Sequence, residues 1–166
     1  LIDSGPMVER STTVVDLCPE MTPADVNARI AGSNDDVIVL SPDPARFGAE
    51  WATPLITEAV RPDVGAVGPM IVRADHDGRP TTIVSVGRTI AGALDDPFTG
   101  VVADDPGPWG AFFVAREVTA VAPAGLVVER SKFEAAGGLA VDVGLDLAVA
   151  ELCVRLARSG ADTIWN

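Results

Sequence analysis

The last part of the chain, residues 118–166, constrains the fold most, because strand and helix patterns alternate there with clear ends. Apolar and β-branched residues predict a strand over Val118–Val128. A short helix is predicted over Ser131–Ala136 and a longer amphipathic helix over about Leu145–Arg158. Gly137-Gly138 separates the two helices, and Asp162–Trp165 begins another strand. This order predicts helices packed on a sheet.

The first part of the chain alternates in the same way. Thr12–Leu17 predicts a strand, and Thr22-Pro23 begins a helix that runs to about Ala31, with Thr22 as its N-cap. Asp36–Leu40 is a short apolar run, typical of a buried strand, and a second helix is predicted over about Ala49–Val60. Alternation of this kind favours an α/β fold with a mostly parallel sheet.

A hairpin and a long loop interrupt the alternation. Val64–Val72 predicts a strand, and Thr81–Val86 returns as its hairpin partner after the turn Ala74–Pro80. Arg88–Trp109 is rich in Gly, Pro and Asp, and a loop of this length is functional or mobile. We therefore expect one domain over residues 12–166, with residues 1–11 disordered or serving as a linker.

Composition limits the partners. The 166 residues carry a formal net charge of −12, which argues against binding nucleic acid or an anionic membrane surface. Cys18 and Cys153 have no metal-ligand spacing, so a disulfide framework or a zinc site is not expected. No apolar run reaches about 18 residues, so no transmembrane segment is expected. The chain begins at Leu1 without an initiator Met, which suggests a piece of a longer protein.

Several motifs together resemble the inverting family 2 glycosyltransferases. V-V-E-R-S-K-F-E-A-A-G-G-L and E-L-C-V-R-L-A-R-S-G-A match the family's "L-L-V-R-R-x-x-F-x-x-V-G-G-L-D-E" and "N-D-V-D-L-C-L-R-L-R-x-A-G-Y". Upstream, V-I-V-L-S-P-D-P and W-x-x-x-L-I-T-E-A-V-R-P-D-V-G-A-V-G-P follow the family's order and spacing. The loop from Asp104 to Arg116 is similar to one in a rhamnan-synthesis subgroup. The resemblance covers roughly residues 12–166.

The resemblance implies a GT-A fold, with the first βαβ unit of the family missing at the N-terminal side. It further implies a nucleotide-diphospho-sugar as donor, a glycan or lipid-linked acceptor, and a role in cell-envelope polysaccharide synthesis. The expected location is the cytoplasm, or the cytoplasmic face of the membrane through other parts of a parent protein. Without the missing unit, the sheet is left with an exposed edge, so we expect self-association.

Asp43 is the candidate donor-binding and metal-binding residue, with Ser41 beside it. In the family an acid at the end of this strand binds a divalent cation, Mg²⁺ or Mn²⁺, that bridges the donor diphosphate. Such hard cations take oxygen ligands and neutralise charge on the leaving group. Because Ser41 and Pro42 replace acid or Asn positions, only one carboxylate remains. The alternative is a plain turn capped by Asp43.

The catalytic base is the position where the chain departs from the family. An inverting transferase needs a carboxylate to deprotonate the acceptor hydroxyl, and the matching residue here is Val149. Asp142 and Asp146 are the candidate substitutes, because Glu151 points elsewhere on the helix. The alternative is that Asp142 caps a loop and that Asp146 lies in the first turn of a helix, where acids are favoured.

Gly137, Gly138 and Trp109 are the candidate acceptor-side residues. The glycine pair either allows close packing beside the acceptor or ends a helix in a left-handed turn. Trp109 either stacks on a sugar or, as we favour, forms a buried anchor. Arg155 is expected to be mainly structural, and His76, the only histidine, is expected to lie exposed in a turn.

Three functions remain open from the sequence. The first is a sugar transferase that has weak or no activity in this chain, and the second is a non-catalytic transferase-like scaffold in a larger cell-envelope protein. The third is an unrelated acidic α/β interaction domain. Catalysis requires a carboxylate within about 6–8 Å of Asp43 in the same cleft, whereas an apolar wall at Val149 favours the scaffold.

Overall fold

The computed structural model describes residues 10–42 and 51–166, and within them the chain forms a six-stranded sheet in the order β1-β2-β9-β3-β10-β8. These strands are β1 (Thr12–Asp16), β2 (Val37–Ser41), β3 (Val64–Gly68), β8 (Arg116–Glu117), β9 (Val127–Glu129) and β10 (Asp162–Trp165). β1, β2, β3 and β10 share one direction, and β8 and β9 run opposite to it. The protein is therefore mixed α/β with a mostly parallel sheet.

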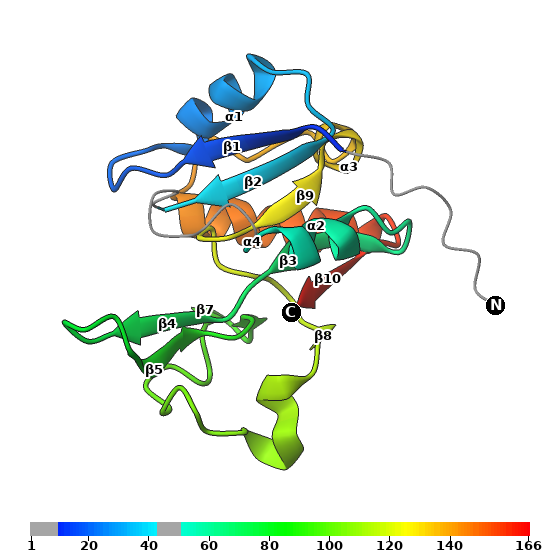
Figure 1. Ribbon diagram of the computed structural model, residues 1–166. Coiled ribbons are helices and arrows are strands. Elements are labelled where there is room, and N and C mark those ends of the chain that lie inside the picture. Colours follow the sequence, from blue (N-terminus) through cyan, green and yellow to red (C-terminus); the bar gives the residue numbers. More distant parts are fainter. Residues whose placement is uncertain (1–9, 43–50) are drawn as a thin grey trace.

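Helices cover both faces of the sheet (Figure 1). The helices are α1 (Pro23–Ala31), α2 (Thr53–Ala59), α3 (Arg130–Ala135) and α4 (Leu145–Arg158). Residues of α1, α3 and α4 share one apolar cluster, whereas residues of α2 belong to another. Along the fully buried β2, Leu40 joins the first cluster and Val39 the second, because side chains alternate across a strand.

Local signals set the helix ends as expected. Thr22 caps α1 by accepting from the amide of Asp25, while the Asp25 carboxylate accepts from the amide of Thr22. The predicted bounds of α4 and β10 are confirmed. The helix expected over about Ala49–Val60 begins later, at Thr53, and Ala49 and Glu50 lie outside the described residues.

Two strand predictions are wrong. The run Val118–Val128 is mainly a connecting segment, and only β9 at its end pairs within the sheet, because Pro123 and the positive φ of Gly125 turn the chain first. The predicted strand Val64–Val72 is split into β3 and a second strand. Pro69, which has no amide hydrogen to donate, lies at the break.

A separate lobe lies below the sheet in Figure 1. It contains the predicted hairpin of β4 (Ile71–Ala74) and β5 (Pro80–Ser85), a small pair of β6 (Thr89–Ile90) and β7 (Leu94–Asp95), and the 3-10 segment η1 (Pro108–Phe113). Ile83, Val86 and Phe112 form its core together with Trp165 of β10. The lobe is thereby joined to the end of the sheet by apolar packing.

Partly buried cations hold the layers together through backbone carbonyls. Lys132 of α3 donates to the carbonyls of Ala59, Arg61 and Val64 at 2.9, 2.6 and 2.7 Å. Arg130 donates to the carbonyls of Asp35 and Ile30 at 2.5 and 3.0 Å. Their charge-assisted hydrogen bonds are therefore spent inside the fold.

β1 forms an edge of the sheet, with β2 as its neighbour in the described residues. Val14, in the middle of β1, remains 49% exposed. An edge strand with an apolar side chain is a template for pairing with another chain. None of the described helices combines the length and apolar character that a bilayer crossing requires.

Candidate functional site

The carboxyl ends of β2 and β3 surround a cavity of about 310 Å³, which we call the strand-end cavity. Pro42 follows β2, Pro69 and Met70 follow β3, and Trp51 lies before α2, all of them lining it. Ligands collect at this edge of open α/β sheets. The sequence predicts a donor site after β2, through Ser41, which ends that strand, and Asp43.

Ser41 is completely buried at the end of β2, and its hydroxyl has no hydrogen-bond partner among the described residues. A buried polar group without a partner is uncommon and costs free energy. Asp43 lies outside the described residues, so its assignments as donor ligand and metal ligand stay predictions. The described lining of the strand-end cavity carries no ionisable side chain. This described lining offers no charged group to a diphosphate or a cation, so both depend on the predicted role of Asp43.

Asp146, a candidate base, lies in the first turn of α4 and is bound by Arg88 at 2.6 Å. Arg88 also binds Asp96 at 2.9 Å, and its own side chain is only 13% exposed. Asp142 lies exposed in the loop before α4 and forms no hydrogen bond or ion pair with the described residues. The structure therefore gives Asp146 a cationic partner on the loop that follows β5.

Val149, at the family's base position, is completely buried in the core between α4 and the sheet. Glu151 is exposed and lies 3.6 Å from Arg155. Val149 is packed inside the core and does not line the strand-end cavity, so the apolar cleft wall expected of a scaffold is not seen at this position.

Gly137 and Gly138 form a left-handed turn after α3, with φ of 86° and 73°. Arg155 donates to the carbonyls of Ala136 and Gly138, the latter at 2.6 Å. The side-chain amide of Asn27 exchanges hydrogen bonds of 2.8 and 3.0 Å with the backbone of Leu139. The helix-ending alternative for the glycine pair is confirmed, and Arg155 is structural, as expected.

Trp109 is fully exposed in η1 and has a positive φ of 54°. The expectation of a buried anchor is wrong, because Gly107 and Gly110 on either side also adopt positive φ and turn this segment outward. Stacking of Trp109 on a sugar stays a prediction.

His76 lies exposed in the β4–β5 turn, as predicted, between Asp75 and Asp77. The three side chains come close enough to offer metal ligands, but all are exposed. One oxygen of Asp75 accepts from the amides of Asp77 and Arg79 at 2.9 Å, so this carboxylate already organises the turn.

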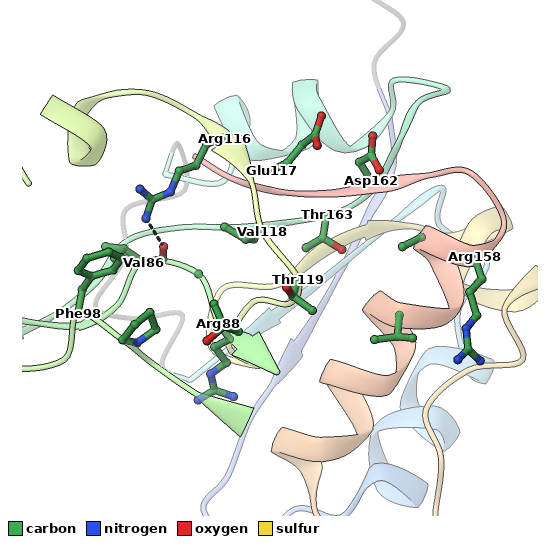
Figure 2. A pocket seen from close by; sticks show the side chains of 15 residues that line it. Val86, Arg88, Phe98, Arg116, Glu117, Val118, Thr119, Arg158, Asp162 and Thr163 are labelled. Atoms are coloured by element: carbon green, nitrogen blue, oxygen red, sulfur yellow. Dashed lines mark hydrogen bonds between the residues drawn. The ribbon is translucent and has the colours of Figure 1, made fainter. Parts of the chain in front are cut away.

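A larger cavity, of about 730 Å³, lies between the lobe, β8, β10 and α4, and we call it the junction cavity (Figure 2). The sequence analysis missed it, since its walls come from segments far apart in the chain. Arg116 of β8 points into the lobe, and its guanidinium lies 5.5, 5.8 and 5.2 Å from the ring centroids of Phe98, Phe112 and Trp165. No local sequence signal points to Arg116, because β8 has only two residues and the other one, Glu117, is exposed.

Comparison with known proteins adds a relative of unknown role. No family model matches the chain. The chain is 28% identical over 142 residues to the "Uncharacterized protein y4gI" of Sinorhizobium fredii (strain NBRC 101917 / NGR234). The match covers 82% of this chain but only 14% of that protein, so the chain spans a small part of its relative's length.

Proposed function

We propose that this chain is a GT-A-like domain of a sugar-transferring protein, with a donor-side pocket at the strand ends and without a working base of its own. The resemblance over residues 12–166 supports the family. The mixed sheet with helices on both faces, and the cavity at the carboxyl ends of β2 and β3, are compatible with it.

The observation that carries the proposal is that the carboxylates on α4 are paired with arginines and that the family's base position is apolar. Val149 is buried at the base position, Asp146 is held by Arg88, and Glu151 is exposed beside Arg155. A general base must reach the hydroxyl that it deprotonates, and neither carboxylate of α4 is free of a cation. Asp142, the other candidate base, has no such cation, but it lies exposed in the loop before α4 and lines neither cavity. The domain therefore binds a nucleotide-sugar or supports a catalytic domain elsewhere in the same protein, and does not transfer the sugar itself.

The test is a calorimetric titration of the chain with UDP-glucose and dTDP-glucose, with and without Mn²⁺, together with an assay for sugar release. We expect binding that strengthens with Mn²⁺ and no turnover. Asp43→Asn should remove the dependence of binding on Mn²⁺. Ser41→Ala should change the affinity for the nucleotide-sugar but leave its dependence on Mn²⁺. Asp77→Asn, in the exposed hairpin turn, is the matched control. Turnover would contradict the proposal that the domain lacks a working base. Absence of binding would contradict the proposal of a donor-side pocket.

A role as a scaffold is the second candidate, favoured by an exposed apolar surface on the lobe. Val102, Trp109, Phe113 and Val114 are all more than half exposed. Exposed apolar side chains gathered on one segment are typical of protein contacts. If the chain binds no nucleotide-sugar, this surface becomes the first one to test for partners, by comparing Trp109→Ser and Phe113→Ser with the unchanged chain.

A further inference from the structure

We propose that the junction cavity binds an organic anion, a single carboxylate or phosphate carried on an apolar body. This site is separate from the strand-end cavity, shares none of its lining residues and does not depend on the proposed function. Its volume of about 730 Å³ lies within the range of small-molecule sites.

The distribution of cations is the first argument. Lys132, Arg130 and Arg155 each donate to backbone carbonyls and also pair with a glutamate on the same helix or next to it. Arg88 is neutralised by two carboxylates. Arg116 differs from these. Within residues 10–42 and 51–166 it forms no ion pair, and it donates only to the carbonyl of Val86, at 3.1 Å (Figure 2). A guanidinium carries five N–H donors, so Arg116 retains capacity for an anion.

The surroundings of Arg116 favour such an anion. Three aromatic rings surround its guanidinium and stabilise the cation through their faces. They also fix the orientation of the side chain and keep water from part of it. A cation fixed in a partly dry site binds a carboxylate or phosphate more strongly than a cation on an open surface does.

Thr163 of β10 forms part of the cavity wall. It is only 2% exposed, and its hydroxyl has no hydrogen-bond partner in the described part of the chain. The thiol of Cys153 is nearby, but a thiol is only a weak hydrogen-bonding group. The hydroxyl is itself buried beside Cys153, so Thr163 offers the cavity wall surface, and Arg116 supplies the polar contact.

The remaining walls of the cavity determine the apolar body and the total charge of the ligand. Val86, Val118, Val154 and Pro97 line the cavity with apolar surface, which a bare inorganic ion would leave unused. Glu117 and Asp162 also contribute to the lining, but in Figure 2 they point away from Arg88 and Thr119. Strand alternation accounts for this, because Arg116 and Thr163 face the cavity. These two acids disfavour a ligand with several negative charges.

The experiment uses four probes and the ¹H–¹⁵N spectrum of the chain. Hexyl phosphate and hexanoate carry an anion on an apolar body, inorganic phosphate lacks the body, and hexyltrimethylammonium reverses the charge. We expect saturable shifts for the two anionic hexyl probes at the indole N–H of Trp165 and the amides of Val118 and Thr163. The other two probes should bind at least about tenfold more weakly.

Single-residue variants then test whether Arg116 contacts the anionic group of the probe. Arg116→Gln should weaken hexyl phosphate about tenfold, the loss expected for a charge-assisted hydrogen bond, whereas Arg79→Gln in the exposed hairpin turn should have no effect. Should Arg116→Gln fail to fold, the comparison of hexyl phosphate with hexyltrimethylammonium on the unchanged chain still tests the charge preference, and hexyl phosphate should bind at least about tenfold more tightly. Equal binding of the ammonium probe, shifts that map outside the cavity, or no saturation for either anionic probe would overturn the proposal. Ser41→Ala should leave these affinities unchanged, which separates this site from the strand-end cavity.

Discussion

Arg88 binds Asp146 at 2.6 Å across a separation of 58 residues, joining the lobe to the first turn of α4. The same guanidinium binds Asp96, so one partly buried cation pairs with two carboxylates. This pairing occupies the carboxylate of α4 that the sequence offered as a base. Asp146 is therefore better explained as a structural contact between the lobe and the sheet layer.

Asp146→Asn should have a small effect on stability. Asp146 is 64% exposed, and exposed ion pairs contribute about 0–1 kcal/mol. Arg88→Ala should cost more, about 1–3 kcal/mol, because Asp96 then loses its cation while one of its oxygens is already buried without a partner. Urea unfolding of both variants and of the double variant measures the coupling. Equal costs for the two single variants would contradict this interpretation.

Gly138→Ala should destabilise the protein more than Gly78→Ala. Both glycines have positive φ, 73° and 79°, so both substitutions carry a backbone cost of about 1–2 kcal/mol. A Cβ at Gly138 would also lie 3.1 Å from Oδ1 of Asn27, whereas a Cβ at Gly78 meets nothing within 4 Å. The difference between the two unfolding free energies isolates the contact with Asn27. A larger loss for Gly78→Ala would show that the turn after α3 relaxes freely.

The stability of the folded protein should fall at alkaline pH because of the thiol of Cys153. Burial raises the pKa of its thiol, and the nearby Thr163 hydroxyl and backbone oppose this only in part. A raised folded-state pKa gives stability that is complete below the unfolded-state pKa of about 8.5 and is lost as pH rises toward the folded-state value. The chain has no Tyr, so few other groups titrate in this window.

Urea unfolding between pH 7 and pH 10 measures this loss. We expect a decline for the unchanged chain and for Cys18→Ala, and a weaker decline for Cys153→Ala. A thiol reagent should modify the exposed Cys18 rapidly and Cys153 only on unfolding. Rapid modification of both thiols in the folded protein would contradict the burial of Cys153.

The edge of β1 should support self-association at high concentration. Val14 is half exposed on a strand whose outer edge has no neighbour in the described residues. Light scattering should show a mass that rises with concentration, and Val14→Lys should return the chain to a monomer. Val84→Lys, on β5 of the lobe, serves as the control substitution and should not change the association. A monomer at all concentrations would show that the edge of β1 does not mediate self-association.

Local signals were enough for much of the secondary structure. The cap at Thr22, the apolar period of residues 145–158 and the β-branched run of β1 predicted their elements closely, because each depends on neighbours within a few residues. The sequence also placed Ser41 at a strand end, where the strand-end cavity lies.

Tertiary structure decided which side chains meet. The sequence could not show that Arg88 would neutralise Asp146, that Trp109 would lie exposed, or that Arg116 would lie among three rings, because each depends on packing between distant segments. The sequence by itself determined where helices and several strands form, since hydrogen bonds and apolar periodicity are local. The contacts that define both cavities came only from the folded arrangement, since strand order and lobe placement are non-local.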